Sequence, residues 1–273
     1  MKAPSFAYAK PRALAEAFEL LERHGEGARI LAGGQSLIPS LNMRLSAPEV
    51  LVDITALSAL RGISLEQGVV RIGALTTHSE IGKSDVVGKH VPMLAQAVPH
   101  IAHPAIRNRG TLGGSLALAD PAAEYPACAL ALDGVIFIEG KGGQRQVRAA
   151  DFFRGLFETA LKPGEVVSAV EFAAIKKDER SVFLELARRH GDYAIIGLAA
   201  HRAASGKRLA FLGAGATPVL AKGAASASTV EEALKKLEKD LAPPADLYHS
   251  SATKLHLAKV LLERAWTTLS KPH

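Results

Sequence analysis

Two glycine-rich loops carry the residue types best suited to ligand binding. The sequence reads Gly33-Gly34-Gln35-Ser36 in the first loop and Gly113-Gly114-Ser115 in the second. Glycine permits left-handed backbone and lets main-chain amides approach a ligand without a Cβ clash, and successive amides can form an anion-binding nest. Two such loops facing each other across a cleft would supply the donors that one diphosphate needs. Because Gly-Gly pairs also mark ordinary turns, the motif alone leaves both interpretations open.

Other kinds of active site find little support in the residue pattern. Neither loop continues as Gly-Lys-Ser/Thr or matches the six-residue Rossmann glycine fingerprint. The ten histidines are dispersed, without a His-Glu-x-x-His arrangement, and neither Ser36 nor Ser115 lies in a sequence context typical of a Ser-His-Asp triad. The sequence therefore predicts no metal site and does not favour a hydrolase.

Composition restricts the class of protein further. The chain has 273 residues, of which 48% are hydrophobic, and a single cysteine, Cys128. One thiol excludes a disulfide framework and a cysteine-ligated iron–sulfur cluster within this chain, and it fits a reducing compartment. We find neither a signal-peptide pattern nor an apolar run long enough to cross a bilayer. We therefore expect a cytoplasmic protein without a membrane span.

The net charge of +6 does not indicate a nucleic-acid-binding protein. The basic residues are scattered among acidic ones, and no basic stripe is interleaved with aromatic side chains. An anionic small ligand or an acidic protein partner would account for the charge equally well.

The elements around the first loop form a β-α-β pattern. Apolar residues at helical spacing predict a helix over 12–24 with Gly25 as its C-cap, and short apolar runs predict strands over 28–34 and 49–55. Pro39 can open a helical turn between these two strands. The first glycine loop would therefore connect a strand to a helical turn.

A second unit and a third follow along the chain. From residue 57 we expect a strand over 68–75, a capping box from Thr77 to Glu80, a helix near 124–132, a hairpin over 134–149 and a strand over 164–173. After the charged segment 175–180 we expect strands over 181–189, 193–203 and 208–215, then helices over 229–240 and 250–269. The prediction is an α+β chain without internal repeats, divided into residues 1–56, 57–175 and 176–273.

Three stretches in this order resemble one known family. They are "ARILAGGQSLIPSLNMRL", "IRNRGTLGGSLALADPAAEYPA" and "ARRHGDYA", and the likeness extends to "RIGALTTHSEI" and the C-terminal helices. The chain resembles the FAD-binding medium subunit of molybdenum hydroxylases, such as those of aerobic carbon monoxide dehydrogenase and the xanthine dehydrogenase family. The resemblance implies a two-subdomain FAD-binding fold of the PCMH type. A smaller α/β C-terminal domain with a three-stranded sheet plus helices would follow it.

The resemblance also implies a set of cofactor-binding residues. The first loop would hold the diphosphate and ribityl region of FAD through backbone amides, and the second would form the opposing wall. Tyr193 matches a tyrosine near the isoalloxazine ring. Many members carry a lysine near the position of Leu184 or Glu185, which this sequence lacks. The implied set is Arg29, Ile30, Leu31, Ala32, Gly33, Gly34, Gln35, Ser36, Leu37, Gly110, Thr111, Gly113, Gly114, Ser115, Asp120, Glu124, Val166 and Tyr193.

By the same resemblance the protein would be an electron-transfer subunit with non-covalent FAD. The molybdenum cofactor and the 2Fe-2S clusters would belong to a large and a small partner subunit in a heterotrimer, which could itself dimerise. Electrons from the partner clusters would pass through FAD to an acceptor. Two alternatives stay open at this point: a stand-alone flavin oxidoreductase of the same fold, and a flavin-free assembly or binding module. The substrate of the complex would be selected in another chain.

Overall fold

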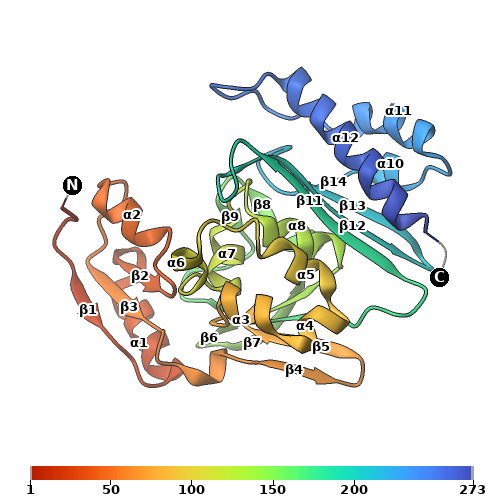
Figure 1. Cartoon of the computed structure of the whole chain (residues 1–273). Coiled ribbons are helices and arrows are strands. Elements are labelled where there is room, and N and C mark those ends of the chain that lie inside the picture. Colours follow the sequence, from red (N-terminus) through yellow and green to blue (C-terminus); the bar gives the residue numbers. More distant parts are fainter. Residues whose placement is uncertain (1, 272–273) are drawn as a thin grey trace.

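The computed structural model describes residues 2–271 and shows three packed units in chain order (Figure 1). A small unit at the N-terminus lies on one side, a second unit occupies the middle, and a sheet with covering helices lies at the opposite side. The glycine loops belong to the first and second units. How these two units meet therefore determines the geometry of any site between the loops.

The N-terminal unit is a parallel sheet with helices beside it. The strand order is β1-β3-β2, and helix α1 places Ala17 and Leu21 in the core beneath the sheet. The predicted helix and both predicted strands are present, and α1 ends at Gly25 with a φ of 49°. Strand β1 was missed because three residues are too short for a periodic pattern. The elements are β1 (Ala7–Ala9), α1 (Leu14–His24), the 3-10 turn Gly25–Gly27, β2 (Ala28–Leu31), α2 (Leu37–Asn42) and β3 (Val50–Asp53).

The middle unit is built on an antiparallel sheet with the strand order β4-β5-β10-β6-β7. The predicted hairpin forms β6 and β7, and the predicted capping box opens helix α3. The strands are β4 (Ile63–Glu66), β5 (Val69–Gly73), β6 (Val135–Gly140), β7 (Gly143–Arg148), β8 (Phe153–Gly155), β9 (Glu158–Thr159) and β10 (Val166–Ala173). The helices are the 3-10 turn Ser58–Leu60, α3 (His78–Lys83), α4 (Asp85–His90), α5 (Pro92–Ala97), α6 (Pro104–Arg107), α7 (Leu112–Leu118), α8 (Glu124–Ala131) and α9 (Ala149–Phe152).

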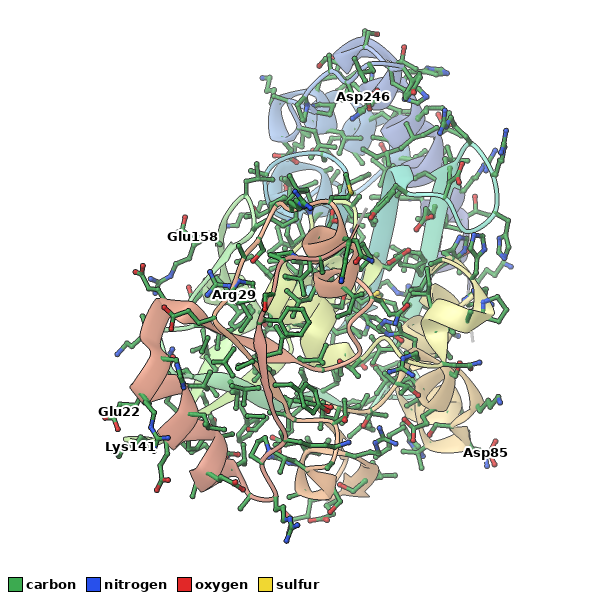
Figure 2. The ribbon with its side chains drawn as sticks, turned by 90° about the vertical axis from the view of Figure 1, so that its left-hand side faces the viewer. Glu22, Arg29, Asp85, Lys141, Glu158 and Asp246 are labelled. Atoms are coloured by element: carbon green, nitrogen blue, oxygen red, sulfur yellow. The ribbon has the colours of Figure 1, made fainter. Side chains whose placement is uncertain are left out.

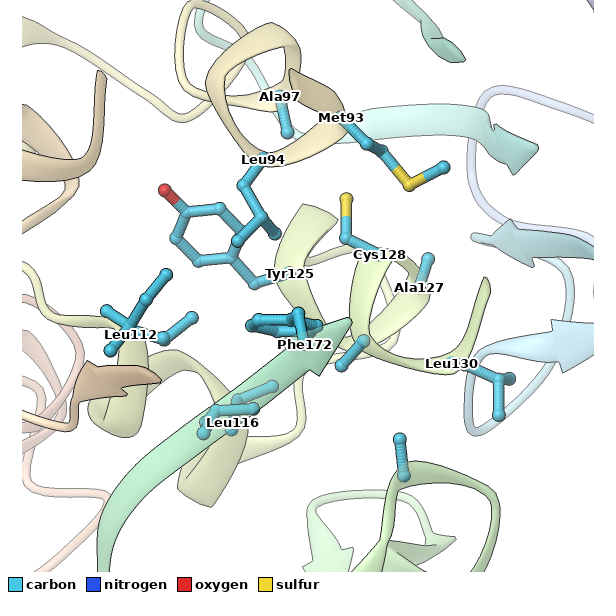
Figure 3. Packing of buried hydrophobic residues seen from close by; sticks show 14 of the residues in the cluster. Met93, Leu94, Ala97, Leu112, Leu116, Tyr125, Ala127, Cys128, Leu130 and Phe172 are labelled. Atoms are coloured by element: carbon cyan, nitrogen blue, oxygen red, sulfur yellow. The ribbon is translucent and has the colours of Figure 1, made fainter. Parts of the chain in front are cut away.

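Helix α8 lies in the centre of the largest core, as Figure 3 shows. All eight residues of this helix are buried, which explains why its sequence is apolar all round rather than amphipathic. Tyr125 and Phe172 are among the largest fully buried side chains of the described residues. The middle unit thereby holds the end of the second glycine loop against a rigid core.

The C-terminal unit packs its sheet between two cores. Its strands pair antiparallel in the order β11-β12-β13-β14, and α11 and α12 cover the face turned away from the middle unit (Figure 1). We predicted a three-stranded sheet here; the described residues form four strands, because the two-residue strand β14 pairs with β13 and is too short to leave a pattern. The elements are β11 (Arg180–Ala187), β12 (Ala194–Ala203), β13 (Gly206–Leu212), β14 (Val219–Leu220), α10 (Lys222–Ala225), α11 (Val230–Asp240) and α12 (Ser251–Leu269).

The hydrophobic cores include residues from both sides of the predicted boundaries at residues 56 and 175. Val166 belongs to the N-terminal core, although it follows residue 57 in the chain. Phe183 and Ala199 of the C-terminal sheet belong to the core of the middle unit. The three-part division stays a prediction about the chain, while the packing joins its parts through shared apolar surfaces.

Candidate functional site

The two glycine loops lie against each other, backbone on backbone. A Cβ built on Gly33 would lie 2.3 Å from the carbonyl oxygen of Arg109 and 2.8 Å from the Cα of Gly110. No side chain fits into that space, so Gly33 is required by the close approach of the loops. The structure therefore brings together the two motifs that the sequence singled out, across the boundary between the first and middle units.

The first loop presents a run of unused backbone donors. Within residues 2–271, the amides of Gly33, Gly34, Gln35, Ser36 and Leu37 donate no hydrogen bond. Gly34 has a φ of 73°, which turns the chain in the left-handed region, and the Gln35 side chain donates to the Gly33 carbonyl at 2.9 Å. Successive free amides in a turn of this kind bind anions such as phosphate. This loop therefore fits the diphosphate of a dinucleotide.

The second loop uses its amides differently. The Gly113 amide donates to the Ala74 carbonyl at 2.8 Å, and the Gly114 amide donates to the Thr111 hydroxyl at 3.1 Å. A Cβ on Gly113 would lie 2.5 Å from the Cβ of Ala74. Gly113 and Gly114 thus seat the start of α7 against β5. The amides of Gly113 and Gly114 are therefore not free to bind a ligand.

His78 is hydrogen-bonded to the second loop through its backbone. Its backbone amide donates to the Gly110 carbonyl at 3.0 Å, and its ring lies 5.3 Å from the ring of Tyr125, centroid to centroid. The side chain is buried, and its Nδ1 has no hydrogen-bond partner among the described residues. Burial, together with the positive charge of Arg107, lowers the pKa of His78 to about 4. The histidine is therefore neutral at physiological pH.

A pocket of about 540 Å³ opens beside the first loop. Of the residues implied by the family resemblance, Leu31, Ala32, Gly33, Gly34 and Gln35 line it. The sequence did not single out the other lining residues, which are Lys10, Ile38, Pro39, Asp53, Thr55 and Arg109.

The polar residues of this pocket gather at the carboxyl ends of β1 and β3. Asp53 accepts hydrogen bonds from the Thr55 hydroxyl at 2.6 Å and from Tyr8, and the Lys10 ammonium lies 3.8 Å away. Burial alone would raise the pKa of Asp53, but the hydrogen bonds from Thr55 and Tyr8 and the charge of Lys10 outweigh it and lower the pKa. A signal existed in the sequence, because Asp53 ends an apolar parallel strand, where ligands commonly bind.

Arg29, Ile30 and Val166 are implied residues that do not line this pocket. Arg29 and Ile30 line a second hollow of about 840 Å³ between the N-terminal unit and the β6–β7 turn. Figure 2 shows Arg29 on the same side of the molecule as the ion pair between Glu22 and Lys141. Val166 is 3% exposed and packs in the N-terminal core. Their proposed contacts with a cofactor stay predictions.

Asp120, Glu124 and Tyr193 form a separate group next to α7 and α8. Tyr193 is 79% exposed, in the loop between β11 and β12, and the charges of Asp120 and Glu124 contribute to its raised pKa after burial. The Gly213 amide donates to the Pro121 carbonyl at 2.9 Å, which ties the C-terminal sheet to the Asp120 loop. The group thus combines residues of the middle and C-terminal units.

No helix within residues 2–271 is long and apolar enough to cross a membrane. In the same part of the chain, no group of three or more His, Cys, Asp or Glu side chains is placed to hold a metal ion.

Family models match nearly the whole chain. Residues 4–173 match the FAD binding domain in molybdopterin dehydrogenase, and residues 181–269 match the carbon monoxide dehydrogenase flavoprotein C-terminal domain. The resemblance drawn from the sequence motifs is thereby confirmed, as is the fold that it implied.

Individual relatives agree over their full length. The 6-hydroxypseudooxynicotine dehydrogenase complex subunit alpha of Paenarthrobacter nicotinovorans is 35% identical, covering 99% of this chain and 95% of its own. Carbon monoxide dehydrogenase from Hydrogenophaga pseudoflava contains a chain that superposes with a TM-score of 0.94 at 34% identity, covering 98% of each chain. Quinoline 2-oxidoreductase from Pseudomonas putida 86 gives a TM-score of 0.92 at 36% identity, again covering 98% of each.

Replacing Gly33 by alanine tests the contact between the loops. The added methyl group would overlap the Arg109 carbonyl, so we expect the free energy of unfolding to fall by about 1–3 kcal/mol in urea titrations. Gly88→Ala is the matched control, because a Cβ there meets nothing within 4 Å and a helical alanine should add up to about 1 kcal/mol. Equal stability of Gly33→Ala and the wild type would show that the loops do not touch.

Because His78 is buried in its neutral form, we expect the free energy of unfolding to fall in acid. The unfolded chain binds a proton at its ordinary pKa of 6.5, whereas the folded chain resists protonation down to about pH 4. The free energy of unfolding should therefore fall by ~3 kcal/mol between pH 6.5 and 4 on account of this residue. In urea titrations across this range, the difference between His78→Gln and the wild type should shrink as the pH falls. A constant difference would contradict the burial of a neutral imidazole.

Proposed function

Because this chain belongs to the family of FAD-binding medium subunits of molybdenum hydroxylases, we propose that it is the electron-transfer subunit of such a complex. It would pass electrons from iron–sulfur clusters of a partner, through FAD, to an acceptor. The observation that carries this proposal is the run of five free amides from Gly33 to Leu37 beside the packed glycine loops. An FAD-binding domain that had lost its ligand would have no need of such a run.

The residues of the chain act on the cofactor by binding and orientation. The first loop would hold the diphosphate non-covalently through its amides, because those donors are free and Gly34 turns the chain in the left-handed region. The hydroxyl groups of Thr111 and Ser115 would approach from the second loop. Tyr193 would shield the ring system with its exposed aromatic face. When bound, FAD can exchange electrons one or two at a time, which suits a junction between iron–sulfur clusters and a two-electron acceptor.

The other redox centres would lie in partner chains. Cys128 is the sole cysteine of the sequence and is buried in α8, so the chain cannot ligate an iron–sulfur cluster through cysteines. We propose a heterotrimer with a small 2Fe-2S subunit and a large subunit holding the molybdenum cofactor, located in the cytoplasm. The related subunit named above, from a 6-hydroxypseudooxynicotine dehydrogenase complex, supports this arrangement.

Adding a negative charge to the first loop tests the binding mode. Ser36 is exposed at the N-cap of α2, where aspartate and asparagine are both tolerated. In Ser36→Asp the carboxylate would repel the diphosphate, and we expect the Kd for FAD to rise at least about tenfold in flavin fluorescence titrations. Ser36→Asn has nearly the same shape without the charge and should stay within about threefold of the wild type. Equal affinities of the two variants would place the diphosphate elsewhere.

Isolation from the native host tests the proposed partners. The chain should co-purify with two further polypeptides, and the preparation should contain molybdenum and iron in addition to FAD. The chain alone, loaded with FAD, should accept electrons from dithionite but should not oxidise an organic substrate. A homo-oligomer isolated with full dehydrogenase activity would instead support a stand-alone flavin oxidoreductase.

A further inference from the structure

Strand β11 places a carboxyl group on a buried face between two units. Val182, Leu184 and Leu186 pack in the C-terminal core, whereas Phe183 packs in the middle core. Side chains alternate along a strand, so Glu185 shares the face of Phe183 and points toward the middle unit. Its side chain is 2% exposed, and its Oε2 has no hydrogen-bond partner among residues 2–271. An unpaired buried carboxylate is costly, which favours the protonated form.

Glu124 is a second buried carboxyl group, in the middle unit that Glu185 faces. It begins α8, and Cys128 follows one turn later on the same face of the helix. Helix α5 packs on both β11 and α8, so it lies between the two elements that carry these groups. The charge of Glu185 contributes to the raised pKa of both Glu124 and Cys128. Figure 3 shows that Cys128 points toward α5, the helix that packs on β11.

Both carboxyl groups have pKa values near neutrality. Burial, with further contributions from the charges of Glu185 and Asp120, raises the pKa of Glu124 to about 8. Burial raises the pKa of Glu185 to about 7. Within residues 2–271, no lysine or arginine forms an ion pair with either group. Each can therefore gain or lose a proton at physiological pH.

Two histidines connect the pair to solvent. The His100 Nδ1 lies 3.9 Å from the Glu185 Oε1, and the ring of His100 lies 6.3 Å from that of His190, centroid to centroid. His190 is exposed, and the side chain of His100 is 32% exposed. Burial, then the charge of His190, lowers the pKa of His100, so this imidazole meets Glu185 as an uncharged group near neutral pH. The exposed end of this chain of groups is open to protons from water.

At the end away from His190, the residue of interest is Tyr193, which we proposed above to shield the ring system of FAD. Glu124 and Asp120 act on Tyr193 through their charges. The loop carrying Tyr193 is held in place because Gly191 approaches the Ala102 carbonyl so closely that a Cβ would lie 2.8 Å from it. His190, His100 and Glu185 thus lie in series from the surface inward, and the charge of Glu124 acts on Tyr193 at the other end.

We propose that Glu185 and Glu124 hold a transferable proton between solvent and the FAD site. This inference rests on the proposed function. Reduction of FAD to FADH₂ consumes two electrons and two protons; the electrons would come singly from the partner's iron–sulfur centres. For each proton, the carboxyl O–H bond of the pair breaks and a bond to the ring system forms. The carboxylate left behind regains its proton from water through His190 and His100. Oxidation of the cofactor returns the protons by the same route.

The remaining groups around Glu185 cannot replace the pair. Burial raises the pKa of the Cys128 thiol and of the Tyr125 hydroxyl well above their ordinary values, so neither exchanges a proton near neutrality. Gln96 of α5 is uncharged and accepts a hydrogen bond from the Phe183 amide at 2.9 Å. The titration near pH 7 on this face therefore belongs to the carboxyl groups of Glu124 and Glu185.

Calorimetry of FAD binding tests the inference without turnover. Titrations of the flavin-free protein at pH 7.5, in two buffers of different ionisation enthalpy, give the number of protons exchanged. Bound FAD would exclude water from the pair and bring a negative diphosphate closer, and both effects raise carboxyl pKa values. The wild type should therefore take up a substantial fraction of a proton for each FAD. Its affinity should fall by about tenfold from pH 6 to pH 9 if binding raises the pKa by one unit.

Glu185→Gln should abolish most of this uptake and flatten the dependence of affinity on pH. Glu263→Gln is the control, since Glu263 is exposed on α12 and should leave both quantities unchanged. Carbon-13 labelling of glutamate carboxyl groups supplies a readout that needs no variant: two signals should titrate above pH 6 in the wild type. FAD binding without proton uptake, or with uptake that survives in Glu185→Gln, overturns the inference and leaves the proposed function intact. Failure to bind FAD at all overturns both.

Discussion

The contact between Gly33 and the backbone of Arg109 and Gly110 is the constraint on which the site depends. A Cβ at Gly33 would come within 2.3 Å of a carbonyl oxygen, so the first and middle units can close only because that side chain is missing. Two further contacts stabilise the packing of the first unit on the middle unit. The His78 amide donates to the Gly110 carbonyl, and Val166 of the middle unit packs in the N-terminal core. The loops are thus fixed relative to each other before any ligand is present.

The two glycine motifs look alike in sequence but differ in how their backbone amides are used. The amides of the first loop are left free, whereas those of Gly113 and Gly114 are already bonded to Ala74 and Thr111. One loop therefore offers donors to an anion, and the other anchors the start of α7. The buried carboxyl groups of Glu124 and Glu185 add a second property to this part of the molecule, because their pKa values lie near neutrality.

Much of this fold could be predicted from the sequence, because long elements leave a periodic signal. Helix α12 and the β6–β7 hairpin were predicted close to their observed bounds. Strands β1 and β14 were missed, since two or three residues carry no period. The glycine loops were recognised as a pair, but the bond from the Gly113 amide to the Ala74 carbonyl is a tertiary contact that no local pattern encodes. Lys10 was missed for the same reason as β1, the strand that it follows.

Hydrogen–deuterium exchange of the backbone amides, with millisecond labelling, tests the central claim most directly. In the free protein, the amides of Gly33 to Leu37 should exchange rapidly, and those of Gly113 and Gly114 should already be protected. Saturation with FAD should slow exchange at Gly33 to Leu37 and change little at Gly113 and Gly114. Binding of FAD that leaves exchange at Gly33 to Leu37 unaltered would contradict the account, because the diphosphate would then be held by other groups.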